Sequence, residues 1–106
     1  MTEPMADTKL GPAGDIPPGE GRVYQADGEK IAVFRTRANE LYAVQAECPH
    51  KRGPLADGLL GGTTLICPLH GWKFDLKTGQ ALFGECGLKT FSISLDAAEN
   101  IVLHRG

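Results

Sequence analysis

Two short segments of this chain each combine one cysteine with one histidine. They are Cys48-Pro49-His50 and Cys67-Pro68-Leu69-His70, with sixteen residues between them. Thiolates and imidazoles are ligands for transition metals. Each cysteine precedes a proline, which favours extended backbone and keeps both segments out of helices. The spacing therefore predicts a metal centre built from two loops.

The distribution of these ligands over the loops bears on which metal they bind. Zinc accepts two cysteines and two histidines, but the common zinc finger takes both cysteines from one turn and both histidines from a helix. Here each loop supplies one of each. This interleaving favours a binuclear iron–sulfur centre in which one iron takes two thiolates and the other two imidazoles. A zinc-stabilised binding module is the alternative.

Short β-strands are expected to position the two loops. Runs rich in β-branched and aromatic residues are separated by turn residues, and Asp27-Gly28 is typical of a two-residue hairpin turn. The expected strands are 22–26, 30–35, 41–44, 63–66, 72–76, 91–95 and 101–103. One of them precedes Cys48 and another leads directly into Cys67. The sequence predicts an all-β domain.

Composition limits the function further. A chain of 106 residues with 42% hydrophobic residues corresponds to one domain. The net charge is −2 and no run of Lys and Arg exceeds two residues, so a nucleic-acid partner is not expected. No apolar stretch approaches the roughly 20 residues of a membrane span. Residues 1–14 lack the apolar region of a signal peptide and are expected to form a flexible tail before a domain at 15–106, in the cytoplasm.

The remaining reactive residues do not form a second site. Cys86 lies in a turn-rich stretch and is expected to be a half-buried small side chain, with a third-ligand or redox role as the alternatives. His104 is expected to be structural or exposed. The carboxylates are scattered and no nucleotide-binding glycine motif occurs. The chain is therefore expected to carry electrons and to hold no substrate.

The two motifs, with their flanking residues, resemble the Rieske-type [2Fe–2S] ferredoxin pattern. The resemblance rests on residues 48–55, 67–75 and 78–79 and covers roughly 16–103. It implies a Rieske fold of small antiparallel sheets with two cluster-binding loops at a tip. It also implies one [2Fe–2S] cluster, with Cys48 and Cys67 on one iron and His50 and His70 on the other.

Residues next to the ligands are expected to surround the cluster or to meet a partner. Glycines allow close approach of backbone, and backbone N–H groups can point toward sulfur. The residues expected around the cluster are Lys51, Arg52, Gly53, Leu69, Gly71 and Trp72. An exposed apolar tip often marks an interaction site. The residues expected to dock a partner are Pro49, Leu55, Leu69 and Trp72.

Two departures from other Rieske proteins predict a low reduction potential. Members in respiratory and photosynthetic complexes carry an additional disulfide between the loops, where this chain has Gly53 and Leu69. They also place a serine after His-Gly, where this chain has Trp72. Without these hydrogen-bond donors the reduced cluster is less stabilised. We therefore expect a potential in the lower part of the roughly −150 to +300 mV Rieske range.

Local sequence also indicates which electron-transfer system the chain serves. Residues 16–22, 31–36, 78–81 and 85–87 resemble the small subunit of NAD(P)H-dependent nitrite reductase. That resemblance implies a nitrite reductase large subunit as the partner. The alternative is the ferredoxin component of a ring-hydroxylating dioxygenase, which would serve a flavin reductase and a terminal oxygenase. Such ferredoxins more often show Cys-Thr-His and a proline shortly after the Thr-Gly turn, and both are missing here.

Overall fold

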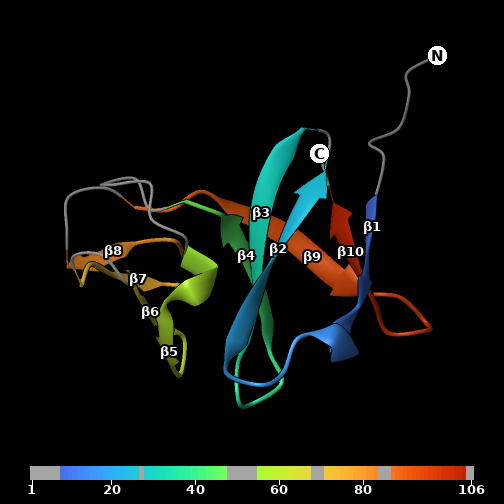
Figure 1. The fold of residues 1–106 in the computed structure, drawn as a ribbon, viewed down its shortest axis with the longest axis horizontal. Coiled ribbons are helices and arrows are strands. Elements are labelled where there is room, and N and C mark those ends of the chain that lie inside the picture. The colour runs from blue at the N-terminus through green and yellow to red at the C-terminus, as the bar shows by residue number, and fades with distance from the viewer. Residues whose placement is uncertain (1–7, 27, 48–54, 68–70, 84–86, 105–106) are drawn as a thin grey trace.

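A computed structural model of the chain describes residues 8–26, 28–47, 55–67, 71–83 and 87–104 (Figure 1). In these ranges it consists of short strands and two single-turn 3-10 helices. The strands are β1 (Thr8–Pro12), β2 (Glu20–Ala26), β3 (Glu29–Arg35), β4 (Leu41–Gln45), β5 (Leu59–Gly61), β6 (Thr64–Ile66), β7 (Lys73–Asp75), β8 (Ala81–Phe83), β9 (Thr90–Leu95) and β10 (Asn100–His104). The 3-10 helices are η1 (Ala13–Asp15) and η2 (Leu55–Asp57). The expectation of an all-β antiparallel fold is confirmed.

The larger sheet has six antiparallel strands in the order β1-β10-β9-β4-β3-β2. Strands β2 and β3 form the predicted hairpin, because Ala26 pairs with Glu29 and leaves two residues for the turn. Gly28 in that turn has a φ of 80°, a conformation that costs glycine little. The sheet curves enough for its edge strands, β1 and β2, to approach each other.

The smaller sheet has four antiparallel strands in the order β5-β6-β7-β8. It lies at one end of the long axis of the molecule (Figure 1). Strands β6 and β7, which flank the second Cys/His segment, are its two central strands. The smaller sheet therefore positions the second predicted loop, and β4 of the larger sheet leads to the first.

Strand β3 separates two hydrophobic cores because it is buried on both faces. Ile31 and Val33 point into the large-sheet core, and Ala32 and Phe34 point into the inter-sheet core. The large-sheet core consists of Ile16, Ala26, Ile31, Val33, Ala43, Ile101 and Leu103. The inter-sheet core consists of Ala32, Phe34, Val44, Ala46, Leu55, Leu65, Cys67, Phe74, Leu76 and Leu88. The second core joins the two sheets.

The expectation of a flexible tail over 1–14 is wrong for residues 8–14. Residues 8–12 form β1, in which Thr8 pairs with Leu103 and Pro12 with Asn100. The sequence did not indicate this strand because it contains Gly11 and Pro12, and both residue types are disfavoured in strand interiors. The structure accommodates them at an edge, with a register shift beside Gly11. Pairing with a strand about ninety positions away thus overrides local propensity.

Strands β5 and β8 were also missed. Each has three residues, none of them β-branched, with glycines nearby, so these segments lack the strand signal of the equally short β6. Both form the edges of the smaller sheet, where pairing with β6 or β7 defines them. None of the helices in the described ranges is long and apolar enough to cross a membrane.

Candidate metal centre

Cys67 directly follows β6 and begins the second loop. Its backbone N–H donates to the carbonyl oxygen of Trp72 at 2.7 Å, and its own carbonyl accepts the N–H of Gly71 at 3.2 Å. These two hydrogen bonds close the loop at its base. Gly71 has a φ of 72°, in the left-handed region that favours glycine. The described base of this loop is therefore defined by backbone hydrogen bonds and by one glycine.

The first loop is closed in a comparable way. The N–H of Leu55 donates to the carbonyl oxygen of Ala46 at 3.0 Å, so the chain returns to the end of β4 after the first Cys/His segment. Leu55 then begins η2, which ends at Asp57 shortly before β5. The two ends of the first loop are thus held together.

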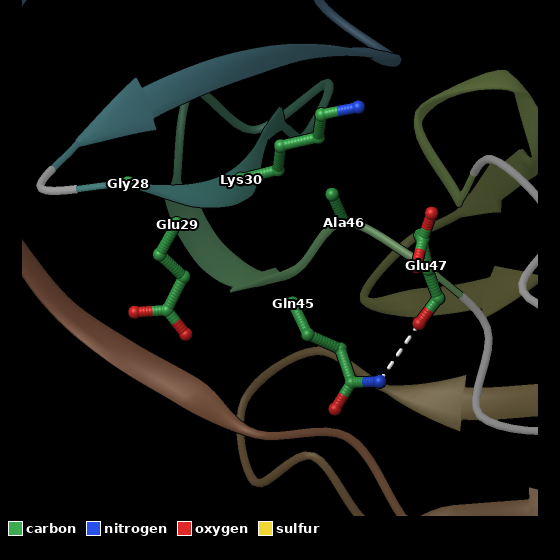
Figure 2. Close-up of a pocket in the computed structure, with 6 residues that line it drawn as sticks. All are labelled: Gly28, Glu29, Lys30, Gln45, Ala46 and Glu47. Atoms are coloured by element: carbon green, nitrogen blue, oxygen red, sulfur yellow. Dashed lines mark hydrogen bonds between the residues drawn. The ribbon is translucent and has the colours of Figure 1, made fainter.

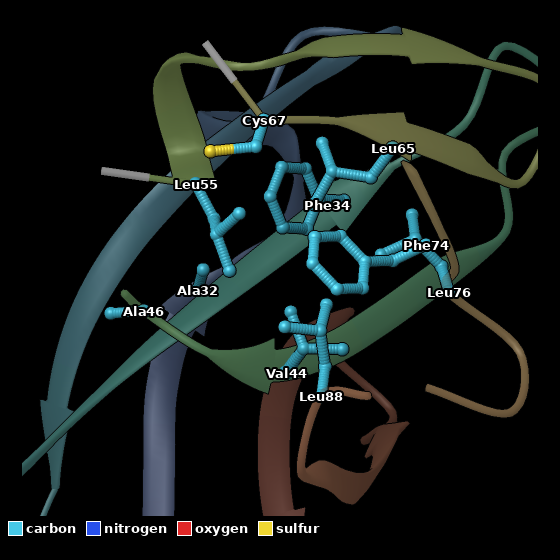
Figure 3. Packing of buried hydrophobic residues seen from close by; sticks show 10 residues of the cluster. All are labelled: Ala32, Phe34, Val44, Ala46, Leu55, Leu65, Cys67, Phe74, Leu76 and Leu88. Atoms are coloured by element: carbon cyan, nitrogen blue, oxygen red, sulfur yellow. The ribbon is translucent and has the colours of Figure 1, made fainter. Parts of the chain in front are cut away.

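Both loops leave from the inter-sheet core. Ala46, Leu55 and Cys67 all belong to this core, at 5%, 0% and 3% exposure. Figure 3 shows the three side chains together with Phe34 and Phe74 of the same cluster. Apolar packing between the sheets therefore brings together the ends of two loops that are distant in the sequence. Each loop contains one of the two predicted Cys/His segments.

Most of the predicted ligands lie outside the described residues. These ligands are Cys48, His50 and His70. Other residues named from the sequence also lie outside the described ranges: Pro49, Lys51, Arg52, Gly53, Leu69 and Cys86. Of the predicted ligands, the structure describes Cys67, a free and buried thiol. Of the residues expected around the cluster, it describes Gly71 and Trp72.

Leu55 does not belong to an exposed docking tip. Its side chain is fully buried in the inter-sheet core, so it cannot contact a partner protein in this structure. The sequence suggested exposure because Leu55 is an apolar residue close to the first Cys/His segment, where an apolar tip was expected. The return of the chain to Ala46 instead turns Leu55 inward.

Trp72 is half-buried and packs against the inter-sheet core. Its ring lies 6.4 Å from the ring of Phe74, measured between centroids, with a tilt of 48°. This is a favourable arrangement for an aromatic pair. Among the side chains of the smaller sheet whose burial the structure describes, the most exposed large apolar ones are instead Leu59, at 71%, and Leu82, at 54%. Sequence reasoning missed both because it missed their strands, β5 and β8.

The described residues fit a buried iron–sulfur group. An apolar environment keeps water away from the Cys67 thiol, and backbone hydrogen bonds hold the described ends of both loops beside it. Two thiolates and two imidazoles in the sequence are the donor set of a Rieske [2Fe–2S] centre. When bound, such a group accepts and releases one electron.

The chain belongs to the Rieske [2Fe-2S] domain family, whose profile matches residues 7–91. The ferredoxin component of biphenyl 2,3-dioxygenase from Rhodococcus jostii is 34% identical over 100 residues, covering 92% of both chains. A 4beta-methylsterol monooxygenase from Methylococcus capsulatus is 44% identical over 62 residues, but this match is 58% of the present chain and 17% of that enzyme. The chain therefore spans a small part of the longer oxygenases that it matches.

Solved structures agree with this classification. A crystal structure provisionally named the small subunit of an NADPH nitrite reductase is 28% identical, with a TM-score of 0.83 and coverage of 93% of this chain and 98% of that chain. The chain is therefore a Rieske domain similar in length to these ferredoxin-like proteins, and this class of domain carries a [2Fe–2S] cluster.

Proposed function

We propose that Cys48, His50, Cys67 and His70 bind the cluster, with the two cysteines on one iron and the two histidines on the other. The observation that carries this proposal is the position of Cys67. It is a buried thiol at the closed base of the second loop, and it shares the inter-sheet core with both ends of the first loop. Lys51, Arg52, Gly53, Leu69, Gly71 and Trp72 would then surround the cluster.

Cys67→Ser tests the ligand assignment. The purified protein should contain two irons and should give a Rieske-type EPR spectrum at low temperature when reduced. Cys67→Ser should abolish the spectrum, because a hydroxyl is a poor replacement for a thiolate ligand. Cys86→Ser is the matched control and should leave it unchanged. A colourless protein with one bound zinc would instead support the zinc-stabilised module.

We further propose that the chain is the small subunit of an assimilatory NAD(P)H nitrite reductase in the cytoplasm. Support comes from the local resemblance at residues 16–22, 31–36 and 78–81 and from the 28% identical structure named as such a subunit. In this role the chain would pass electrons to a sirohaem-containing large subunit. Trp72, with Pro49 and Leu69, is the proposed contact surface.

The second candidate is the ferredoxin of a ring-hydroxylating dioxygenase. The 34% identity to the biphenyl dioxygenase ferredoxin, over nearly the full length of both chains, favours it. In that role the partners would be a flavin reductase and a terminal oxygenase. The two candidates share the cluster and differ in the protein that accepts the electron.

Gene deletion separates the two systems. A deletion strain that fails to grow on nitrate or nitrite as nitrogen source, but grows on ammonium, would support the nitrite reductase role. Normal growth on nitrite with loss of aromatic-ring oxidation would support the dioxygenase role. Complementation with wild type and with Cys67→Ser tests in the same strain whether the cluster is required.

A further inference from the structure

Gln45 connects the first loop to a distant segment of the chain. It is the last residue of β4 and lies three positions before Cys48. Its side-chain Nε2 donates to the carbonyl oxygen of Glu47 at 2.7 Å, and its Oε1 accepts the backbone N–H of Lys89 at 2.8 Å. Figure 2 shows the Gln45 amide directed toward Glu47. One amide group therefore joins two segments that are more than forty residues apart.

Lys89 is itself held in place, so it offers Gln45 a fixed partner. The backbone N–H of Gln45 donates to the Lys89 carbonyl at 2.9 Å, which makes the contact between the two residues reciprocal. The Lys89 ammonium lies 3.3 Å from Oε2 of Glu29 and 5.0 Å from the ring centre of Phe91. Contacts to β3 and β9 thus fix the residue against which the Gln45 amide is braced.

The chemistry of this position requires a glutamine. A carboxamide donates and accepts through one planar group, whereas a carboxylate of the same shape only accepts. A glutamate would still accept the Lys89 N–H but would face the Glu47 carbonyl with a second acceptor. Gln45 and Glu47 also line an open pocket of about 420 Å³, together with Gly28, Glu29, Lys30 and Ala46. Because the Gln45 side chain borders this open space, its orientation depends more on its two hydrogen bonds than on packing against neighbouring side chains.

The hydrogen bond to Glu47 acts on the start of the first loop. The carbonyl of Glu47 and the amide nitrogen of Cys48 belong to the same planar peptide unit. An interaction that fixes the direction of the Glu47 carbonyl therefore restrains the peptide unit that leads into the first loop. Backbone N–H groups near metal-bound sulfur adjust the electronic properties of a metal site.

We propose that Gln45 is a positioning residue that sets the orientation of the Glu47 carbonyl, at the entry to the first loop, by bracing it against Lys89, and so tunes the cluster. This inference rests on the proposed function, in which Cys48 is a ligand. Gln45 does not touch the cluster in this proposal. It acts through the carbonyl of Glu47.

Gln45→Met tests the proposal, because methionine has a similar length, no charge and no hydrogen-bonding amide. The variant is compared with wild-type holoprotein in the EPR g-values of the reduced cluster, the midpoint potential and the rate of cluster loss. We expect shifted g-values, a shifted potential and roughly tenfold faster cluster loss. Gln25→Met, at an exposed glutamine of β2, is the matched control and should leave all three unchanged.

The outcomes separate this inference from the proposed function. A wild-type protein without a Rieske EPR signal contradicts the ligand assignment itself. A wild-type signal that is identical in Gln45→Met, with equal potential and cluster-loss rate, overturns the role of Gln45 alone, whatever happens to the unfolding temperature. If Gln45→Met yields no holoprotein, Gln45→Asn replaces it. Its shorter amide cannot reach both partners, so wild-type values in that variant would equally overturn the proposal.

Discussion

The backbone N–H of Leu88 donates to the carbonyl oxygen of Gly79 at 2.6 Å. This contact joins the turn between β7 and β8 to the segment that enters β9, and so connects the two sheets through the backbone. The Leu88 side chain is buried in the inter-sheet core at the same place. Gly79 has a φ of 79°, and a side chain there would meet the Leu88 carbonyl. The two segments can approach this closely because each has a glycine at the contact, Gly79 in the turn and Gly87 directly before Leu88.

Gly87→Ala should destabilise the protein by disturbing this crossing. A Cβ atom at Gly87 would lie 2.6 Å from the carbonyl oxygen of Gly79, a backbone atom that cannot move aside without displacing the turn. We expect a loss of about 2 kcal/mol, typical of overpacking, measured by chemical denaturation. Gly61→Ala is the control, since a Cβ there meets nothing within 4 Å. Equal stability of the two variants would contradict the tight crossing.

Leu55→Ala should reduce stability while leaving the exposed surface unchanged. The side chain is fully buried in the inter-sheet core, so its truncation leaves a cavity and should cost about 2–5 kcal/mol. Leu59→Ala removes the same atoms at a position that is 71% exposed and should change stability by less than about 0.5 kcal/mol. Thermal and denaturant unfolding of the two variants measure the difference. A mild effect at Leu55 would argue for the exposed tip that the sequence suggested.

Asp96 should make the stability of the β9–β10 hairpin depend on pH. The backbone N–H of Asn100 is the main cause that lowers the pKa of this carboxyl below 3.8, with further contributions from Ala98, the Asn100 side chain and Lys9. Because the folded pKa is depressed, the unfolded chain binds more protons below pH 3.8. The stabilisation is therefore present above that pH and is lost as pH falls through the folded pKa.

Asp96→Asn tests the pH dependence. The difference in unfolding temperature between wild type and variant should be largest near neutral pH and should shrink as the solution is acidified below pH 3.8. An NMR titration of the Asp96 carboxyl gives its folded pKa directly. A difference between the two proteins that is constant down to the lowest accessible pH would refute the linkage.

The reduction potential should lie in the lower part of the roughly −150 to +300 mV Rieske range. The chain has Gly53 and Leu69 where high-potential relatives have a disulfide, and Trp72 where they have a serine donor. Fewer hydrogen bonds to the cluster leave the additional electron less stabilised. Redox titration followed by EPR measures the potential. Trp72→Ser should raise it by restoring a donor, and Trp72→Phe serves as the control without one.

The local pattern predicted most of the larger sheet. A continuous apolar run at 31–34, alternating apolar residues at 91–95 and the Asp27-Gly28 turn were sufficient for β3, β9 and the β2–β3 hairpin. These features depend on residues that are close in the sequence. Strands β1, β5 and β8 were not predictable in this way. They are short or contain glycine and proline, and their pairing partners define them.

The sequence by itself determined the class of this protein, since the types and spacing of two cysteines and two histidines indicate a mixed-ligand iron–sulfur centre. Tertiary structure decided what surrounds the two loops. It buried Leu55, closed each loop with backbone hydrogen bonds and braced Gln45 against Lys89. These relationships join residues that are distant along the chain. They depend on how two sheets pack, and no local pattern of residue types encodes that packing.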